Sequence, residues 1–217
     1  MAMGFPARVF AIILRISPGR VRNWMWRWWY QRLAKAHQRA DFRFMNYGYK
    51  DDEELKLSEE DEPNRLFIQL YNLNIRDVDL KGKEVVEIGS GRGGGASWIA
   101  KTYEPKKLIG FDFSKDAVGL ANEWYSSQTN LSFKEGNAES LPLDDNSQDI
   151  IYNVESSHCY GNVGAFVKDV YRVLRTGGNF CWTDFRDKPT MEKLHHIFLD
   201  SGFRIVAKGD ITSEVLE

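Results

Sequence analysis

A glycine-rich stretch with an acid in front of it is the strongest chemical signal in this sequence. Residues 87–95 read Glu-Ile-Gly-Ser-Gly-Arg-Gly-Gly-Gly, between a predicted strand and a helix predicted to begin near Ala96. Glycines at such a place let the backbone approach a ligand closely at a helix N-terminus. Gly89, Gly91 and Gly94 also satisfy the dinucleotide pattern G-x-G-x-x-G, which is weak evidence when taken alone. An ionised Glu87 would repel a pyrophosphate and attract a cation, so the stretch favours a ligand with ammonium and sulfonium groups over a dinucleotide.

A histidine lies at a second position suited to chemistry. His158 follows the predicted strand 150–154, at the carboxyl edge of the sheet, where doubly wound folds bind their ligands. The pKa of imidazole suits a general base. A single histidine is more often an ordinary surface or core residue, but this location favours a function for His158. Glu155 is a candidate substrate contact.

The other reactive side chains favour structural roles. Cys159 is expected to pack rather than to act as a nucleophile. Cys159 and Cys181 show no C-x-x-C or Cys/His ligand spacing, so we interpret both as reduced thiols of an intracellular protein. His195 and His196 fall in a predicted surface helix without neighbouring ligand residues, so no metal is expected.

The elements that position these residues alternate along the chain. Short apolar runs at 85–88, 108–111, 131–133, 150–154 and 180–183 are separated by helix-length segments, the pattern of a parallel sheet. Ser114 is a predicted N-cap for a helix to about Tyr125, and Gly177-Gly178 is predicted to end a helix that runs from Ala165 to Arg175. Pro63 is expected to start a helix, and Gly202 to stop another that begins at Met191. Residues 203–207 are a candidate sixth strand.

The net charge of −2 is the sum of two unequal parts. Residues 1–43 hold nine Lys or Arg and one acid, a net +8, so the remainder carries −10. A predicted amphipathic helix over 20–40 places Trp24 and Trp28 among arginines on its polar face. This basic arm is a candidate lid on the protein's own body or a candidate peripheral membrane contact, since anionic headgroups and an interfacial aromatic belt would use both residue types. Binding of single-stranded nucleic acid is the weakest option and is not expected.

The apolar runs of the arm bear on where in the cell the protein is expected. The longest apolar run in the arm, residues 9–14, is too short for a transmembrane helix or a secretory signal. A cytoplasmic protein, peripheral on a membrane, is therefore expected, and a mitochondrial presequence is the lesser alternative. Residues 51–62 hold eight acids and one Lys, a pattern typical of a solvated linker.

Several motifs occur in the order typical of one enzyme family. Over roughly residues 84–205 the sequence resembles the class I S-adenosylmethionine-dependent methyltransferases. Residues 87–93 are similar to the family's acidic, glycine-rich first motif, and Asp112 to the acid that binds the ribose hydroxyls. Residues 136–142 resemble the segment beside the adenine, with Asn137 where the family often has Asp. Residues 173–178 resemble the segment V-L-R-P-G-G, with Thr176 in place of Pro.

The resemblance implies a fold, a cofactor and a binding site. The fold would be the Rossmann-like, doubly wound, mostly parallel α/β sheet of these enzymes, with an N-terminal helical arm and a truncated C-terminal edge. The arm and linker would occupy residues 1–63, and the methyltransferase domain residues 64–217. The cofactor would be S-adenosyl-L-methionine, bound by Glu87, Gly89, Ser90, Gly91, Gly93, Asp112, Phe113, Asn137, Ala138, Glu139, Val154 and Glu155.

Three further segments, at 44–49, 91–97 and 153–160, resemble lipid and polyketide O-methyltransferases of the phthiotriolone type and, beyond them, sugar O-methyltransferases. This resemblance implies that the N-terminal helices and residues 47–49 close over the acceptor, with Tyr47, Tyr49, His158 and Tyr160 as substrate contacts. It supports His158 as general base. Asp184, at the end of the strand 180–183, matches the family's second acid and would orient His158 or the acceptor hydroxyl.

The leading hypothesis is therefore an O-methyltransferase that acts on a hydrophobic, hydroxylated small molecule. One alternative is C-methylation of a sterol or quinone-like ring, which would use the same cofactor site. Another is a catalytically silent cofactor-binding protein associated with a membrane. The sequence stops at Glu217, soon after the candidate sixth strand, whereas the family usually continues through further elements.

Overall fold

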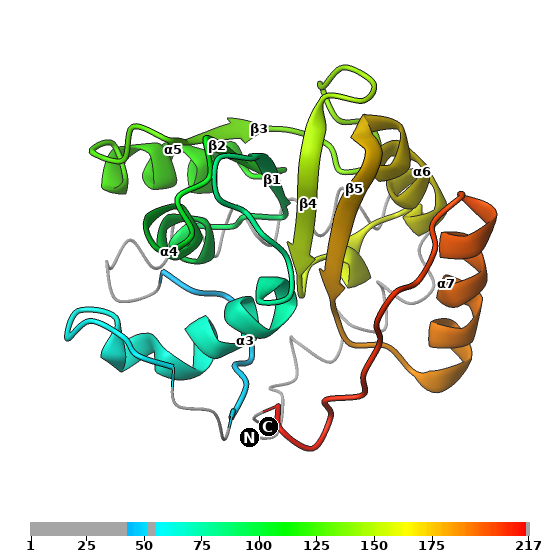
Figure 1. Ribbon diagram of the computed structural model, residues 1–217, viewed down its shortest axis with the longest axis horizontal. Helices are drawn as coiled ribbons and strands as arrows, with labels where there is room; N and C mark the ends of the chain where they lie inside the picture. Colours follow the sequence, from blue (N-terminus) through cyan, green and yellow to red (C-terminus); the bar gives the residue numbers. More distant parts are fainter. Residues whose placement is uncertain (1–42, 52–54, 216–217) are drawn as a thin grey trace, which may run out of the picture.

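A five-stranded sheet forms the centre of the computed structural model, which describes residues 43–51 and 55–215 (Figure 1). Every pairing is parallel, in the order β3-β2-β1-β4-β5. The order reverses between β1 and β4, which makes a switch point where such sheets bind ligands. The predicted doubly wound, Rossmann-like α/β fold is confirmed. The strands are β1 (Glu84–Ile88), β2 (Lys107–Asp112), β3 (Leu131–Glu135), β4 (Gln148–Val154) and β5 (Leu174–Thr183).

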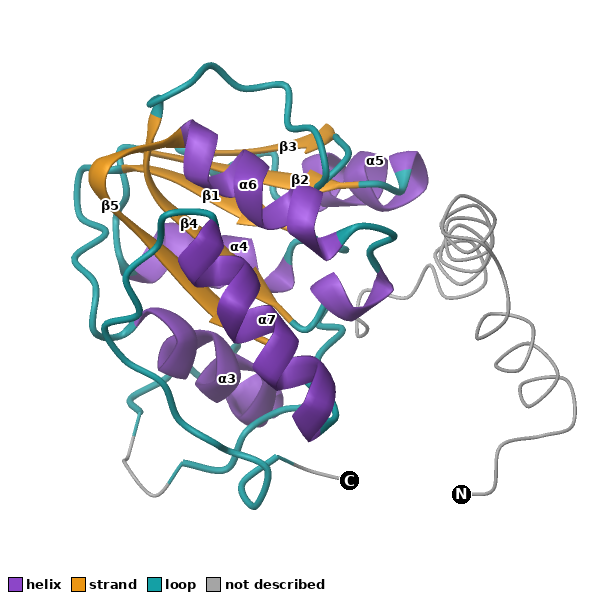
Figure 2. Cartoon of the chain, turned by 90° about the vertical axis from the view of Figure 1, so that its right-hand side faces the viewer, coloured by secondary structure: helices purple, strands orange, loops and turns teal. Residues whose placement is uncertain are grey.

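Helices cover both faces of the sheet (Figure 2). One face carries α3 (Arg65–Ile75), α4 (Gly94–Thr102) and α5 (Lys115–Trp124), and the other carries α6 (Val163–Val173) and α7 (Lys188–Asp200). Successive strand residues point to opposite faces, so Val85 joins the first core cluster and Val86 the second. Short 3₁₀ turns occupy η1 (Glu62–Asn64) and η2 (Ser157–Cys159).

Local sequence signals explain several helix ends. Ser114 caps α5 as predicted, since its side chain accepts a hydrogen bond from the Ala117 backbone N–H at 3.3 Å. The Asp187 side chain caps α7 in the same way, since it accepts a hydrogen bond from the Thr190 backbone N–H at 2.7 Å. This helix therefore begins at Lys188, earlier than the predicted Met191. Gly202, with a φ of 100°, follows the C-cap residue Ser201 and ends α7 as predicted.

Two predictions about the C-terminal part are wrong. The helix predicted over 165–175 ends at Val173, because Leu174 already pairs with Gln148 of β4. The candidate strand at 203–207 is irregular. A cavity of about 880 Å³ is lined both by β5 and by residues 202–209, and this segment adds no strand to the β5 edge.

Residues 43–51, which we call the entry strap, pack against the body. The Phe44 ring is buried and stacks on Phe67 of α3 at 6.0 Å between centroids. The Asn46 amide donates to the Phe67 carbonyl oxygen at 3.1 Å, and the Tyr49 backbone N–H donates to the Leu66 carbonyl oxygen at 2.9 Å. The predicted amphipathic arm lies outside the described residues.

Part of the segment 51–62, which was predicted to be a solvated linker, packs against the body of the protein. Leu55 and Leu57 pack against the core cluster of α3 and α4. Within the described residues, no helix has both the length and the apolar character needed to cross a membrane.

Candidate active site

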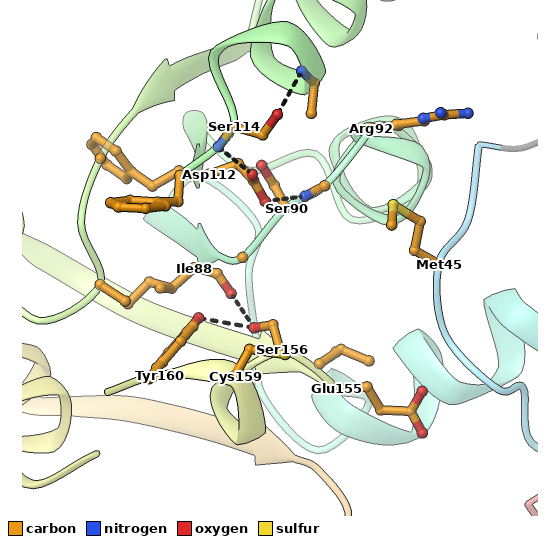
Figure 3. A pocket seen from close by; sticks show the side chains of 18 of the residues that line it. Met45, Ile88, Ser90, Arg92, Asp112, Ser114, Glu155, Ser156, Cys159 and Tyr160 are labelled. Carbon is orange, nitrogen blue, oxygen red and sulfur yellow. Dashed lines mark hydrogen bonds between the residues drawn. The ribbon is translucent and has the colours of Figure 1, made fainter. Parts of the chain in front are cut away.

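A cavity of about 180 Å³ opens at the carboxyl ends of β1, β2 and β4, at the switch point (Figure 3). Its walls come from the glycine loop, the ends of these strands, the loop after β3, η2 and the entry strap. The structure therefore gathers residues that are far apart in the sequence. The residues predicted to bind cofactor that line it are Gly89, Ser90, Gly91, Asp112, Phe113, Asn137, Ala138, Glu139, Val154 and Glu155.

The glycine loop approaches its neighbours too closely for larger side chains. The backbone N–H groups of Gly89 and Ser90 donate to the Phe111 carbonyl oxygen at 2.8 and 3.0 Å. Gly89 has a φ of 78°, and a Cβ there would overlap the Ser156 side chain. Gly93, with a φ of 80°, forms the N-cap of α4 and packs against Phe133 instead of lining the cavity. The glycines thus shape the loop as well as its ligand surface.

Asp112 joins the loop to the end of β2. One carboxylate oxygen accepts from the Gly91 N–H at 2.8 Å, and the other accepts from the Ser114 N–H at 2.8 Å. Burial raises the pKa of Asp112, against these backbone hydrogen bonds, which lower it. The Phe113 backbone N–H also hydrogen-bonds to this carboxylate, so about one of its four lone pairs is left to accept from a ligand hydroxyl.

Polar groups of the cavity fit a nucleoside cofactor. The Ser90 hydroxyl is buried and has no hydrogen-bond partner among the described residues, so it calls for a polar ligand group. The Asn137 side-chain oxygen accepts from the Glu139 N–H at 3.0 Å and has a second lone pair for a ligand. One oxygen of Glu139 accepts from Gly161 and Asn162 at 2.8 and 2.9 Å, which fixes the entry to α6.

Glu87 lies beneath the glycine loop and does not line the cavity. Its side chain points to the α3 face of the sheet, where Tyr71 and Tyr152 donate to its two oxygens at 3.0 and 3.1 Å. Burial raises the pKa of Glu87 to about 8, so the carboxyl is mostly protonated near pH 7. The attraction of a cationic ligand to an ionised Glu87 therefore stays a prediction, because Glu87 lies behind the cavity wall. The Tyr71 ring does line the cavity and connects Glu87 to it.

His158 and Asp184 form a hydrogen-bonded pair next to the cavity. His158 Nδ1 lies 2.8 Å from Asp184 Oδ1, and the Asp184 side chain is fully buried. Burial alone would raise the pKa of Asp184, but the hydrogen bond with His158 and the charge of Arg186 lower it overall, so Asp184 is the acceptor. Burial lowers the pKa of His158, but hydrogen bonds with Asp184 and Cys159 raise it to about 9.

The entry strap and a few aromatic rings surround this pair. The Tyr47 N–H donates to Glu155 Oε2 at 2.7 Å, and the Tyr47 ring meets Phe185 at 5.6 Å between centroids. Phe185 in turn lies 4.2 Å from the His158 ring. Of the predicted substrate contacts, Tyr160 lines the cavity, whereas Tyr47, Tyr49 and His158 lie outside its wall. Tyr49 instead bridges to Val215.

Sequence reasoning missed several cavity residues. Met45 and Asn46 reach it from the entry strap, and Tyr71 reaches it from α3. Met45 and Asn46 lie in the segment 44–49 that carries part of the resemblance, but the prediction assigned that segment to the acceptor, and no local motif marks Tyr71, which tertiary packing brings to the switch point. Within the described part of the chain, no group of three or more potential ligand side chains could hold a metal ion.

Known proteins are similar to this chain in sequence and in fold. Residues 86–182 match the family described as "Methyltransferase domain". The chain is 34% identical over 212 residues to the phthiotriol/phenolphthiotriol dimycocerosates methyltransferase of Mycobacterium tuberculosis, which covers 97% of this chain and 78% of that relative. It is 38% identical over 189 residues to the fatty-acid O-methyltransferase of Mycolicibacterium smegmatis, which covers 86% of this chain and 69% of that relative.

A solved structure supports the fold. Geranyl diphosphate C-methyltransferase from Streptomyces coelicolor, in complex with S-adenosyl-L-homocysteine, superimposes with a TM-score of 0.64 at 15% identity, over 86% of this chain and 83% of that one. The sheet and its switch-point cavity define an α/β protein built to hold a nucleoside cofactor. The chain belongs to the class I S-adenosylmethionine-dependent methyltransferases, in the group that contains the two relatives above. S-adenosylmethionine is its cofactor, as the sequence predicted.

Proposed function

We propose that this methyltransferase transfers the methyl group to a hydroxyl of a hydrophobic, lipid-like acceptor, with His158 as general base. The observation that carries the proposal is the hydrogen bond between His158 Nδ1 and Asp184 Oδ1 at 2.8 Å, directly beside the cofactor cavity. The names of the two relatives, which describe lipid substrates, support a lipid-like acceptor.

The proposed mechanism is an in-line displacement that depends mainly on positioning. When bound, S-adenosylmethionine supplies an electrophilic methyl group on a sulfonium. Asp184 accepts a hydrogen bond from the Nδ1–H of His158 and thereby selects the tautomer in which Nε2 carries the lone pair. Nε2 would take the proton of the acceptor hydroxyl, and the acceptor oxygen would replace sulfur on the methyl carbon, so that the C–S bond breaks and S-adenosylhomocysteine leaves. Apolar contacts from Tyr47 and Phe185 would hold the acceptor chain near His158.

The protonation state of His158 favours a second candidate acceptor. With a pKa of about 9, the ring is mostly an imidazolium near pH 7 and would attract a carboxylate. A carboxylate oxygen needs no base to be methylated, so His158 would then position the acceptor without removing a proton. The name of the fatty-acid O-methyltransferase relative supports this second candidate.

A paired acceptor panel separates these candidates. The purified protein would be incubated with a radiolabelled methyl donor and long-chain secondary alcohols, the matching carboxylic acids, or quinone-like rings. We expect label in the methyl ether of the alcohols, identified by mass spectrometry. Label confined to methyl esters would favour the carboxylate candidate, and label on carbon would contradict both.

We also propose that the basic arm, residues 1–43, contacts an anionic membrane surface. Its net charge of +8 and its tryptophans support this assignment. A membrane-bound enzyme would meet a lipid acceptor at its source, which fits the proposed substrate class.

A further inference from the structure

Arg186 lies beside the His158–Asp184 pair, in the loop between β5 and α7. Its side chain is only 8% exposed, although it does not line the cofactor cavity, and the Asp184 side chain that it meets is fully buried. Withdrawal of a charged guanidinium from water is costly unless its N–H groups find partners. The partners of Arg186 therefore indicate what this residue does.

The guanidinium of Arg186 holds two neighbouring oxygens at once. Its Nη1 lies 3.2 Å from Asp184 Oδ1, and its Nη2 donates to Ser157 Oγ at 2.9 Å. Nη1 also donates to the Phe185 carbonyl oxygen at 2.7 Å, and the guanidinium carbon lies 5.9 Å from the centre of the Trp182 ring. The planar fork of an arginine suits such a double contact, whereas a lysine offers a single nitrogen. Arg186 is therefore fixed relative to both oxygens.

The Ser157 hydroxyl receives its direction from two groups that can only donate. Trp182 Nε1–H donates to Ser157 Oγ at 3.0 Å, and the Arg186 guanidinium donates to the same oxygen. Indole and guanidinium nitrogens carry no acceptor lone pair, and a hydroxyl oxygen has two lone pairs. Since both are occupied, the Ser157 proton must point to Asp184 Oδ2, which lies 2.6 Å away.

The same reasoning continues from Asp184 to His158. Asp184 Oδ2 also accepts from the His158 backbone N–H at 2.9 Å, and Oδ1 accepts from the Phe185 backbone N–H at 2.9 Å. A carboxylate that is surrounded by donors has no place for a proton of its own. The proton between Asp184 and His158 Nδ1 therefore belongs to the imidazole.

We propose that Arg186 is a positioning residue for methyl transfer, which acts through Ser157 and Asp184 to fix the His158 ring and to keep a proton on Nδ1. His158 Nε2 is then the ring nitrogen available to the acceptor. The inference rests on the proposed role of His158 as general base. Arg186 itself acts only through Asp184, because it does not line the cofactor cavity.

The Nδ1–H of His158 provides a signal that needs no acceptor. With a His158 pKa of about 9, this proton is present near neutral pH. Its hydrogen bond to a buried carboxylate should give a far-downfield proton NMR signal that exchanges slowly with water. The signal is assigned by its loss in His158→Gln. In Arg186→Met it should broaden or disappear, because Asp184 is no longer held; an unchanged signal would overturn the proposal.

Two further variants separate positioning from folding. Arg186→Lys keeps the positive charge but not the fork, so it should remain folded and still broaden the signal. Arg175→Gln removes another Asp-paired arginine, 2.7 Å from Asp149 at the amino end of β5, and should leave the signal as in the wild type. A wild-type signal in Arg186→Lys would contradict the role of the fork. An equal change in Arg175→Gln would contradict a specific role of Arg186.

Turnover with a hydroxylated lipid acceptor gives a second readout. Arg186→Met should lower kcat by roughly 10- to 100-fold, because a misplacement of about 1 Å can cost about 10²-fold. Its affinity for S-adenosylhomocysteine, measured by calorimetry, should stay unchanged. In the His158→Gln background, Arg186→Met should lower kcat no further, and an equal further loss there would overturn the proposal. If no hydroxyl acceptor is methylated, the proposed function fails, whereas the NMR signals still test Arg186.

Discussion

Asp184 holds the Nδ1 atom of His158 at 2.8 Å, although the two residues are 26 positions apart and follow different strands. The parallel pairing of β4 and β5 brings the ends of these strands together at one edge of the sheet. Asp184 also accepts from the Ser157 hydroxyl at 2.6 Å and lies 3.2 Å from Arg186. Because the carboxylate is fixed by several partners, the His158 ring has a defined orientation.

Asp112 should contribute strongly to cofactor affinity. Asp112→Asn removes the charge from a group that is placed to accept from ligand hydroxyls and already accepts from Gly91 and Ser114. Loss of hydrogen bonds to a charged acceptor costs about 1.5–3 kcal/mol, so we expect S-adenosylhomocysteine to bind about 10- to 150-fold more weakly. Calorimetry measures this directly, with Asp144→Asn on the exposed loop as control. Equal affinity of both variants would refute the role of Asp112.

Gly89 should tolerate no side chain. Gly89→Ala places a Cβ against Ser156 in a backbone with a φ of 78°, so both cofactor binding and stability should fall. Gly82→Ala is the matched control, since Gly82 has a φ of 70° but nothing lies within 4 Å of the added Cβ. We expect the melting temperature to fall about 2–4 °C per kcal/mol lost, and further for Gly89→Ala than for Gly82→Ala. Similar melting temperatures and similar binding would contradict this account of the loop.

Glu87 should make the stability of the protein depend on pH. Its pKa rises from 4.5 to about 8 through burial, so the folded protein keeps a proton that the unfolded chain loses above pH 4.5. The resulting stability is present below pH 4.5 and is lost as the pH rises through 8. Between about pH 6 and 9 the wild-type melting temperature should fall by about 5 °C more than that of Glu87→Gln. Glu123→Gln, exposed on α5, should behave like the wild type, and a Glu87→Gln curve parallel to the wild type would disprove the assignment.

The basic arm should control membrane binding. Deletion of residues 2–42 removes most of the +8 charge but keeps the entry strap. The full chain should sediment with vesicles rich in phosphatidylserine, and the deletion variant should lose most of that binding. Neutral phosphatidylcholine vesicles are the control. Equal sedimentation of the two proteins would leave the lid interpretation in place.

Local signals predicted much of the fold and only part of the site. The strands, the Ser114 cap and the cavity position of Asp112 follow from hydrophobic runs, a capping residue and an acid at a strand end. The sequence did not predict that Glu87 faces Tyr71, because this depends on which face of β1 is covered by α3. It also wrongly predicted a strand at 203–207, where the apolar pattern is present but the segment does not join the sheet.

The pH dependence of kcat/KM with a hydroxylated lipid acceptor tests the central claim most directly. If neutral His158 is the base, kcat/KM should rise about tenfold per pH unit and level off near pH 9, where the ring loses its proton. His158→Gln should lower kcat by about 10²–10⁴-fold and lose this pH dependence, while His196→Gln keeps both. A profile that is flat from pH 6 to 9, or a His158→Gln variant with full turnover, would contradict the account.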